Sequence, residues 1–301
     1  MEKYKASVII PTYNRLDELK LTLDSLVSQQ SSYEFEVIVA DDGSYEDTKS
    51  LIDRYIGNLN IKYCFQEDKG FRAGSARNMG IKLSKGDICI FIDNGIILHS
   101  QAIESHINTH INEQVPCIVL GYVYGFETEK GREEELISII TQNSPDDAID
   151  MLRRAEMYDI RESCYQVLGS DLWKWPAPFV VCFSCNLSVT RDMLIKVDMF
   201  DEFFTGWGSE DLDLGLSLFK SGVKFILSRG ASSIHYPHKK YHSFDVPVSL
   251  ENMNRTQLYE VMNHRKKERH MLKKHPIRPM ELWINITDPV ELNRALLEEG
   301  K

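Results

Sequence analysis

Residues 203–214 hold the side chains best suited to chemistry, because an aromatic residue between two glycines is followed closely by two acids. The indole of Trp207 could lie against a flat, partly apolar ligand such as a sugar ring. Glu210 and Asp211 stand where a helix should begin, and a carboxylate beside a sugar platform can remove a proton from a hydroxyl group. A plain helix start capped by Ser209 would explain the two acids. It would not explain the glycines around the tryptophan, so we favour an acid that acts on a sugar.

The composition suits an ordinary globular protein of one large or two small domains. The 301 residues include 45 acidic and 35 basic ones, and the resulting net charge of −10 argues against a general nucleic-acid binder. Cys182 and Cys185 have the spacing of a metal or redox pair, but no second pair completes a zinc set. Because the sequence shows no signal-peptide core and no apolar run of membrane-spanning length, we expect a cytoplasmic protein.

The first 125 residues alternate between short apolar runs and amphipathic segments, which predicts strands alternating with helices. We expect strands at 7–11, 35–40, 61–65, 87–92 and 115–122, and helices at 16–30, 46–56, 73–84 and 100–112. This order predicts an α/β fold with a mainly parallel central sheet and right-handed crossovers. Such sheets bind ligands beyond the carboxyl ends of their strands.

Polar clusters follow three of the expected strands, at residues 11–14, 41–44 and 93–95. One cluster would be ordinary turn chemistry, because Asp, Asn, Gly and Ser favour turns. Three clusters at the same sheet edge favour a crevice for a nucleotide. The glycine pattern of a dinucleotide-binding fold does not follow the first strand, and no P-loop pattern occurs, which argues against both of those nucleotide folds.

The remainder of the chain divides into three further segments. Residues 126–175 are polar and charge-rich, and we expect a helical insertion or a lid over the site. Residues 176–245 return to regular structure. In that segment we expect strands at 180–185 and 223–227, a helix from about 190 and a helix at 210–221. Residues 246–301 should form a helical extension, whose basic run at 264–275 is either a solvated face or a peripheral membrane contact.

Taken together, these features resemble the family 2 glycosyltransferases of the GT-A fold. The segments that carry the resemblance are SVIIPTYN at 7–14, VIVADDGS at 37–44, ARNMG at 76–80 and the strand at 87–93. Residues 200–214 resemble the acceptor-side motif of β-1,4-galactosyltransferases and of bacterial chondroitin polymerases. The resemblance covers about residues 6–245. It implies that residues 1–125 form the nucleotide-sugar-binding half, and residues 176–245 the acceptor half, of one GT-A domain.

The resemblance implies an enzyme whose donor is a uridine diphosphate (UDP) sugar. Thr12 and Tyr13 would line the base and ribose pocket, and Asp41 would bond the uracil edge. Arg77 and Arg72 would approach the diphosphate, because a guanidinium fork suits phosphate oxygens. The full set implied to bind the nucleotide sugar is Pro11, Thr12, Tyr13, Arg15, Asp41, Asp42, Arg72, Arg77, Asp93 and Asn94.

Asp93 would be the first residue of the family's Asp-x-Asp metal motif, but Gly95 stands where the second carboxylate belongs. Mn²⁺ and Mg²⁺ prefer oxygen ligands, and the substrate's own phosphates can supply several of them. The resemblance also implies a histidine ligand, for which His235 is our candidate and His238 the alternate. We therefore expect a divalent cation that binds weakly without nucleotide.

In the implied mechanism, a hexose or an N-acetylhexosamine moves in a single displacement with inversion. Asp211 would be the general base, Trp207 the sugar platform, and Glu210 and Gly208 would help to hold the acceptor. Asp213 lies two residues further along the helix and is expected to be structural. The acceptor could be a glycan, a glycolipid, a peptide or a small molecule.

Two other classes of protein share parts of this pattern. A nucleotidyltransferase would need a glycine-rich, basic signature near the first strand, and residues 11–15 do not provide one. A non-catalytic binder of nucleotide sugars or carbohydrates is suggested by Gly95, whereas the intact motif from Trp207 to Asp211 favours catalysis. The sequence leaves open the donor sugar, the acceptor, the linkage and the oligomeric state.

Overall fold

A computed structural model of the chain describes residues 4–126, 131–237, 255–283 and 285–300. The chain separates into two compact units, Met1–Pro237 and His238–Lys301. The candidate site residues lie in the first unit, apart from the alternate metal ligand His238, which lies outside the described residues.

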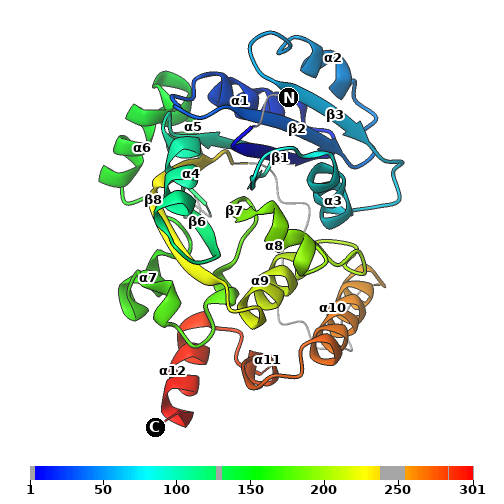
Figure 1. Cartoon of the computed structure of the whole chain (residues 1–301), viewed down its shortest axis with the longest axis vertical. Helices are drawn as coiled ribbons and strands as arrows, with labels where there is room; N and C mark the ends of the chain where they lie inside the picture. The colour runs from blue at the N-terminus through cyan, green and yellow to red at the C-terminus, as the bar shows by residue number, and fades with distance from the viewer. Residues whose placement is uncertain (1–3, 127–130, 238–254, 284, 301) are drawn as a thin grey trace. The chain divides into compact units, whose positions relative to one another are not determined.

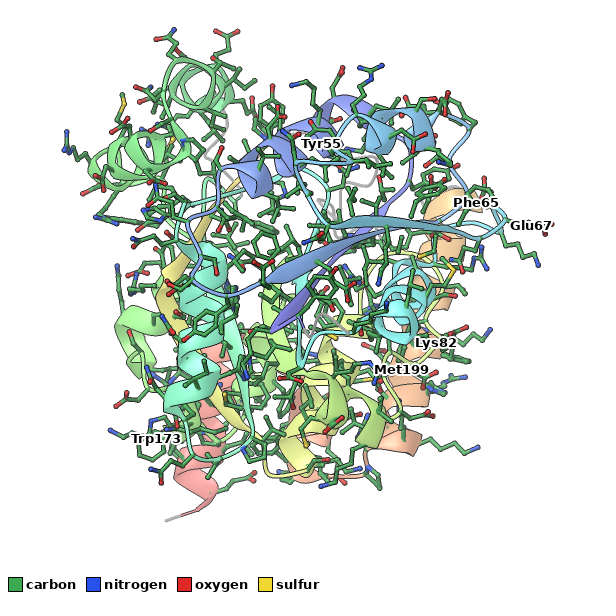
Figure 2. All side chains as sticks on the ribbon, turned by 45° about the horizontal axis from the view of Figure 1, so that its top comes forward. Tyr55, Phe65, Glu67, Lys82, Trp173 and Met199 are labelled. Carbon is green, nitrogen blue, oxygen red and sulfur yellow. The ribbon has the colours of Figure 1, made fainter. Side chains whose placement is uncertain are left out.

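The described strands of the first unit form one sheet, in the order β3-β2-β1-β4-β7-β6-β8-β5 (Figure 1). They are β1 (Ala6–Thr12), β2 (Phe35–Asp41), β3 (Ile61–Phe65), β4 (Ile88–Ile92), β5 (Ile96–Leu98), β6 (Cys117–Tyr124), β7 (Asn186–Thr190) and β8 (Lys224–His235). Helices α1 (Leu16–Val27), α2 (Thr48–Asp53), α3 (Ala73–Leu83), α4 (Ala102–Asn112), α8 (Arg191–Lys196) and α9 (Glu210–Lys220) accompany them. Beyond β3, the chain projects from the sheet, with Phe65 and Glu67 near the tip (Figure 2). The predicted α/β fold is confirmed.

Apolar side chains build the centre of the sheet. Val8 on β1 lies opposite Val37 of β2 and Ile90 of β4, and all three are fully buried. Such fully apolar strands are typical of parallel pairs covered on both faces. On α1, Leu19 and Leu23 fall on one face and are buried, as the helical period predicts. The carboxyl ends of β1, β2 and β4 therefore meet at one edge.

The sheet is more mixed than the sequence predicts, because β7 runs antiparallel to β4 and β6, and β5 runs antiparallel to β8. The strand expected at 180–185 is wrong, since a 3₁₀ turn occupies Pro178–Val181 and β7 starts only at Asn186. The pattern of apolar residues does not predict β7, because Asn186 and Ser188 are polar. Both are buried and bond the two ring nitrogens of His106, at 2.8 and 2.9 Å.

Strand β8 is longer than the strand expected at 223–227, and it continues to His235. Its pairing with β6 shifts register between Gly121 and Val123. Such an irregularity bends a strand without ending it. Residues 231–235 thus belong to β8 instead of following it, and His235 comes to lie opposite Ile96 of β5.

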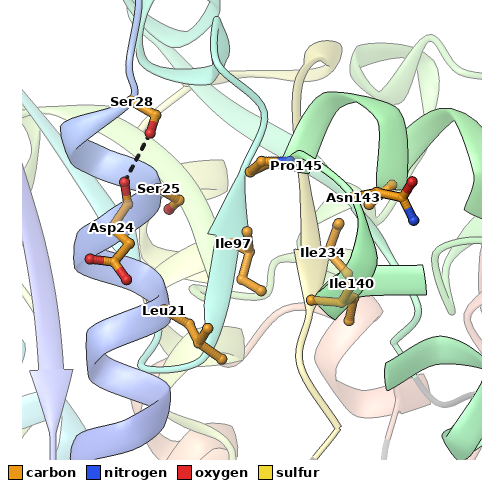
Figure 3. Close-up of a pocket in the computed structure, with 10 residues that line it drawn as sticks. Leu21, Asp24, Ser25, Ser28, Ile97, Ile140, Asn143, Pro145 and Ile234 are labelled. Carbon is orange, nitrogen blue, oxygen red and sulfur yellow. Dashed lines mark hydrogen bonds between the residues drawn. The ribbon is translucent and has the colours of Figure 1, made fainter. Parts of the chain in front are cut away.

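The segment expected to be a helical insertion contains α5 (Glu133–Gln142), α6 (Pro145–Arg154) and α7 (Glu162–Leu168). Ser144 caps α6 by accepting the backbone N–H of Asp147 at 3.2 Å, ahead of a proline in the first turn. Between α1, β5 and the α5–α6 pair lies a cavity of about 180 Å³, lined by apolar side chains that include Ile97, Ile140 and Ile234 (Figure 3). The candidate site residues do not line this cavity, and a lid role for the segment stays a prediction.

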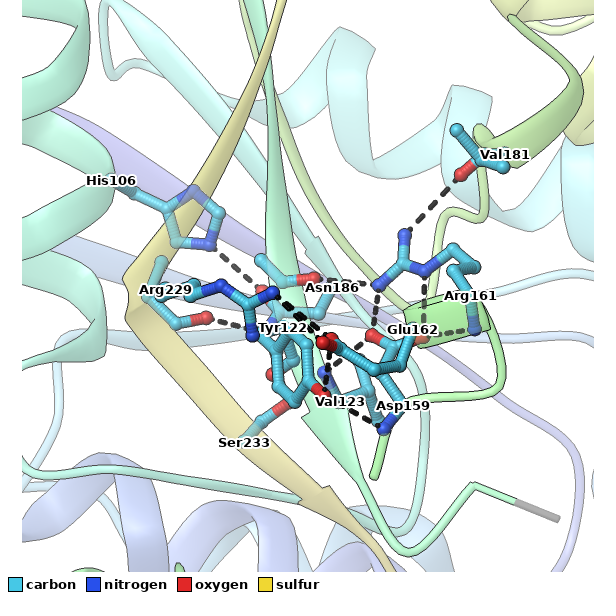
Figure 4. A network of polar contacts seen from close by, with 12 residues as sticks. His106, Tyr122, Val123, Asp159, Arg161, Glu162, Val181, Asn186, Arg229 and Ser233 are labelled. Atoms are coloured by element: carbon cyan, nitrogen blue, oxygen red, sulfur yellow. Dashed lines mark hydrogen bonds and ion pairs between the residues drawn. The ribbon is translucent and has the colours of Figure 1, made fainter. Parts of the chain in front are cut away.

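A buried polar network fixes the start of α7 to β6 (Figure 4). Arg161 pairs with Asp159 at 2.6 Å and donates to the carbonyl oxygen of Gly121 at 2.7 Å. Asp159 also accepts the backbone N–H of Val123 at 2.8 Å. Because both charged residues are buried, each leaves an uncompensated charge if the other is removed. The network makes this part of the segment a component of the sheet's scaffold.

The second unit is helical where it is described. It contains α10 (Arg255–Lys274), α11 (Arg278–Trp283) and α12 (Pro289–Glu299). Arg278 and Glu299 join α11 to α12 through an ion pair of 2.5 Å. Within the basic run at 264–275, Lys267 and His275 are buried, so only part of the run is exposed, and its membrane contact is untested. Of the helices that the structure describes, none combines the length and the apolar character needed to span a bilayer.

Candidate active site

The polar turns after β1, β2 and β4 form one continuous rim. The side-chain amide of Asn94 donates to Thr12 Oγ1 at 2.8 Å and to the carbonyl oxygens of Asn14 and Arg15, both at 3.3 Å. The backbone N–H of Asn14 donates to Ser44 Oγ at 2.7 Å. The three clusters therefore lie together, as their position at the ends of neighbouring strands predicts.

Asp41 lies beneath this rim and is fully buried. Its Oδ1 accepts the backbone N–H groups of Gly43 and Ser44, at 3.1 and 2.8 Å, and its Oδ2 accepts the hydroxyl of Tyr63 at 2.9 Å. Both carboxylate oxygens are thus used within the protein. The geometry makes Asp41 a residue that shapes the turn, and its contact with the uracil edge stays a prediction.

Asp42 fixes the connection between β3 and α3, the projecting loop of Figure 2. Its Oδ2 accepts the backbone N–H of Arg72 and its Oδ1 the side chain of Gln66, both at 2.6 Å. Burial raises the pKa of the Asp42 carboxyl, although these donors and the Arg72 guanidinium at 3.4 Å oppose the rise. Arg72 is therefore held against the rim.

Tyr13 is an exposed aromatic residue at the same rim, one residue beyond the end of β1. Its hydroxyl donates to Asp68 Oδ2 at 3.0 Å, and this hydrogen bond raises the pKa of the phenol. Pro11 lies two residues earlier, opposite Ala40 of β2. The exposed ring of Tyr13 has a face on which a nucleotide base can stack, and its place in the base and ribose pocket stays a prediction.

Arg77, on α3, lies among three carboxylates. Its guanidinium is 2.8 Å from Asp93, 3.4 Å from Glu210 and 3.7 Å from Asp211, and only 4% of its side chain is exposed. The ring of Phe200 covers it, with 5.3 Å between the guanidinium carbon and the ring centroid. With all three acids ionised, the cluster carries a net charge of −2, which favours a further cation. The approach of Arg77 to a diphosphate stays a prediction, but this bridge joins Asp93 at the rim to Glu210 and Asp211 at the start of α9.

Asp211 is oriented by Ser184, a residue that sequence reasoning missed. Ser184 Oγ donates to Asp211 Oδ1 at 2.6 Å, and its backbone N–H donates to Oδ2 at 3.2 Å. Ser184 is buried, whereas 27% of the Asp211 side chain is exposed. Burial raises the pKa of the Asp211 carboxyl, opposed by Arg77 and Ser184 and assisted by the charge of Asp93. The next acid along α9, Asp213, is fully buried, in line with a structural role.

The only sequence signal near Ser184 was the Cys-x-x-Cys spacing around it. Cys182 and Cys185 are free and buried, and burial raises the pKa of both thiols. Neutral buried thiols behave as small apolar side chains. The two cysteines thus pack the segment that presents Ser184 to Asp211.

Trp207 lies in the loop before α9, with 66% of its surface exposed. Gly206, Gly208 and Ser209 all have positive φ, at 77°, 83° and 80°, a backbone that glycine adopts without strain. The Ser209 side chain makes no capping bond to α9, so a plain capped helix start does not describe this loop. The backbone N–H of Gly206 donates to the carbonyl oxygen of Phe71 at 2.8 Å. The loop before α9 is thereby attached to the connection between β3 and α3.

His235 and Asp93 lie at the ends of β8 and β4, and the ring of His235 meets Phe126 edge-on, with 4.5 Å between ring centroids. Within the described parts of the chain, no group of three or more His, Cys, Asp or Glu side chains is arranged to hold an ion. The most exposed carboxylate around Arg77 is that of Asp93, which is 37% exposed and already paired with the guanidinium. This donor set fits a divalent cation only when phosphate and water oxygens complete the site.

Comparisons with known proteins decide the family. The model of glycosyl transferase family 2 matches residues 7–187, more than half of the chain, and that of the N-terminal domain of galactosyltransferase matches residues 166–243. The chain belongs to glycosyl transferase family 2. It is 33% identical over 300 residues to validoxylamine A glucosyltransferase of Streptomyces hygroscopicus subsp. jinggangensis, covering 97% of the chain and 67% of that protein. This family 2 glycosyltransferase is also 31% identical over 237 residues to chondroitin synthase of Pasteurella multocida, covering 76% of the chain and 24% of that protein.

Solved structures share the fold at low sequence identity. TarS 1-349 of S. aureus in complex with UDP-GlcNAc has a TM-score of 0.57 at 20% identity, covering 89% of this chain and 66% of TarS 1-349. Mannosyltransferase PcManGT of Pyrobaculum calidifontis, in complex with GDP-Man and Mn²⁺, has a TM-score of 0.59 at 16% identity, covering 99% and 75%. At these identities the likeness establishes the GT-A fold, and the family matches establish that the chain is a glycosyltransferase.

Proposed function

We propose that this glycosyltransferase moves a hexose or an N-acetylhexosamine from a UDP-sugar to an acceptor hydroxyl, with inversion at the anomeric carbon. The bridge that Arg77 makes between Asp93 and Asp211 carries this proposal. The same guanidinium contacts Asp93, at the donor rim, and Asp211, the expected base. The UDP-GlcNAc bound by TarS supports the donor class.

In this proposal, Asp211 accepts the proton of the acceptor hydroxyl while the acceptor oxygen forms its bond to the anomeric carbon. The bond from that carbon to the diphosphate oxygen breaks, and the nucleoside diphosphate leaves with the electron pair. Ser184 holds both oxygens of Asp211, which fixes the direction in which the base points. A base positioned in this way contributes roughly 10²- to 10⁴-fold to the rate.

The acceptor would lie against Trp207, whose indole is the most exposed large apolar side chain of residues 203–214. The Glu210 carboxylate would accept hydrogen bonds from the hydroxyl groups of the acceptor. The backbone at Gly208 would form further hydrogen bonds with these groups. Alignment of acceptor, sugar and leaving group would supply much of the remaining acceleration. A glycan, a glycolipid, a peptide and a small molecule all offer a suitable hydroxyl.

Asp93 and His235 are the residues that would hold a divalent cation, Mn²⁺ or Mg²⁺, together with the donor's phosphates. Such an ion supplies positive charge that stabilises the diphosphate as it leaves. The Mn²⁺ in the PcManGT complex supports a divalent cation as the cofactor.

A donor screen tests the proposal. The chain is incubated with UDP-glucose, UDP-galactose, UDP-GlcNAc and UDP-GalNAc, with and without Mn²⁺ and with candidate acceptors, and released UDP is measured. Asp211→Asn should bind UDP as the wild type does and transfer at least about 100-fold more slowly. Asp192→Asn, an exposed acid on α8, is the matched control and should transfer at the wild-type rate. A turnover of Asp211→Asn close to the wild type would disprove the assigned base.

The second candidate is a non-catalytic binder of nucleotide sugars, which Gly95 in the metal motif favours. Such a protein would bind UDP-sugars in calorimetry and release no UDP from any donor, with or without acceptor. A nucleotidyltransferase would also release no UDP in this screen, but it would release pyrophosphate from UTP and a sugar 1-phosphate. A parallel incubation with these two substrates separates it from the binder.

A further inference from the structure

Helix α3 contains the segment ARNMG at 76–80, of which only the arginine has a place in the proposed function. The helix lies very close to β1, since a Cβ at Gly80 would be 2.4 Å from Ile9 Cγ2. Near its other end, a Cβ at Gly74 would lie 3.4 Å from the Cβ of Phe200. Helix α3 therefore packs on the sheet and also on the chain that leads to the loop before α9.

Asn78 binds that chain through both of its backbone groups. The buried side-chain amide donates from Nδ2 to the carbonyl oxygen of Phe200 at 2.8 Å, and Oδ1 accepts the backbone N–H of Phe200 at 3.0 Å. We call this pair of hydrogen bonds the amide clamp. Nδ2 also donates to Glu202 Oε1 at 3.0 Å. An ionised aspartate of the same shape could accept but could not donate, so the clamp requires an amide.

The clamp fixes a residue that follows an unusual turn. Asp198 and Met199 have φ values of 66° and 60°, in the left-handed region that residues with a side chain seldom adopt. Such a conformation persists only where the surrounding contacts maintain it. The ring of Phe200 is 1% exposed and meets Phe91 of β4 edge-on, with 5.3 Å between ring centroids. Burial of the ring and the clamp together determine where Phe200 lies.

The ring of Phe200 is a partner of the Arg77 guanidinium, whose central carbon lies 5.3 Å from the ring centroid. Arg77 Nε is buried and makes no hydrogen bond within the described residues, so the guanidinium depends on the ring and on its three carboxylates. The contact with Asp211, at 3.7 Å, is the longest of the three ion pairs. It is therefore the one that a small movement of the guanidinium would break first.

We propose that Asn78 is a positioning residue of the transfer reaction, which holds Phe200 over Arg77 and thereby keeps the guanidinium in contact with Asp211. The inference rests on the proposed function, because it takes Asp211 as the base. Without the clamp, the ring would move, water would reach the guanidinium, and the base would lose its charged partner. Misplacement of a group by about 1 Å can slow an enzyme roughly 100-fold.

The kinetic test separates positioning of the base from binding of the substrates. Asn78→Ala should lower kcat roughly 10- to 100-fold, while the acceptor KM and the affinity for UDP change less than about twofold. Asn78→Asp should not restore the rate, because it cannot donate to the Phe200 carbonyl. Phe200→Leu keeps the clamp and removes the ring, and should lower kcat by a similar factor. The double variant should be no slower than the slower single variant, because both changes break one chain of contacts.

Gln29 offers a matched control. Its side-chain amide makes a similar clamp where α1 ends, donating to the carbonyl oxygen of His99 at 2.8 Å and accepting the backbone N–H of Ile103 at 3.1 Å. Gln29→Ala should lower the thermal unfolding midpoint, as Asn78→Ala does, but should keep the wild-type kcat. Loss of an amide clamp in general is thereby distinguished from loss of the clamp that holds Phe200.

A second readout needs no substrate. In the NMR spectrum, the Nε–H signal of Arg77 should be displaced by the nearby ring and should exchange slowly with water, because this nitrogen is buried. Arg77→Lys assigns the signal by removing it. Asn78→Ala should abolish the displacement and speed the exchange. If Asn78→Ala does not fold, Phe200→Leu carries both tests.

The outcomes keep this inference apart from the proposed function. An unchanged Arg77 signal in Asn78→Ala would overturn the inference, and so would a wild-type kcat or a change confined to the acceptor KM. If the wild type releases no UDP from any donor in the screen, the proposed donor class is wrong instead. The NMR comparison then still decides whether Asn78 holds Phe200 over Arg77.

Discussion

The donor rim and the loop before α9 are built in different ways, although Arg77 touches both. On the rim, hydrogen bonds run from one turn to the next, as from Asn94 to Thr12, and carboxylates are bonded within the protein. The loop around Trp207 has three neighbouring residues with positive φ and a highly exposed indole. A rim fixed by internal bonds is preorganised for a ligand of constant shape, such as a nucleotide diphosphate. A loop rich in glycine can adjust, which would suit a variable acceptor in the proposed function.

Arg77→Met should have the largest effect, because both regions lose their shared partner. It leaves three acids close together without the guanidinium. Removing one partner of a buried ion pair costs about 3–5 kcal/mol, and we expect about 3 kcal/mol because two of the acids are partly exposed. Urea unfolding at pH 7 measures this loss, and Arg77→Lys should recover part of it. A methionine variant as stable as the wild type would show that the bridge is not needed for folding.

As the pH falls, the scaffold around His106 should lose stability before the donor rim is affected. Burial lowers the pKa of His106 to about 4, partly offset by its bond to Asn186. The unfolded chain therefore binds this proton from about pH 6.5 downward, while the folded protein does not. The contribution of His106 to the free energy of unfolding is fully present above pH 6.5. About 2 kcal/mol of that free energy should be lost by pH 5 because the unfolded chain takes up the proton. Unfolding midpoints measured across pH 5–7 test this prediction. In His106→Gln, the slope of stability against pH should be smaller by an amount that corresponds to nearly one proton.

Trp207→Ala should separate the two regions by function. It should raise the acceptor KM roughly tenfold, which corresponds to about 1.4 kcal/mol, and leave UDP binding unchanged. Steady-state kinetics with varied acceptor and calorimetry with UDP measure the two effects. Trp207→Phe, which keeps an aromatic face, is the control. An equal loss of UDP affinity would mean that the indole belongs to the donor site as well.

Ser184→Ala should have the smallest effect, because the backbone N–H still donates to Asp211. Loss of the hydroxyl should lower kcat about fivefold, near 1 kcal/mol, with little change in acceptor KM. Ser184→Thr restores the hydroxyl and should recover most of the rate. A change in KM alone would place Ser184 in acceptor binding instead of base orientation.

The sequence predicts β1 to β4 and their polar turns well, because apolar runs and turn residues act over short distances along the chain. It predicts β7 poorly, because Asn186 and Ser188 are satisfied in a buried strand by partners far along the chain, such as His106, 80 and 82 residues away. For the same reason it does not reveal that Ser184 bonds Asp211 or that Arg77 meets Glu210, 133 residues further along. Local patterns predict where polar groups cluster, and tertiary contacts decide which of them meet.

The hydrogen bond from Gly206 to the carbonyl of Phe71 has a practical consequence for protein engineering. It makes the acceptor motif and the connection between β3 and α3 a single composite unit, although they are far apart along the chain. A chimera that exchanges only residues 200–214 with a relative would graft one half of this unit onto an unrelated support. If residues 200–214 bind the acceptor, as we propose, transplanting acceptor preference requires both segments to be moved together.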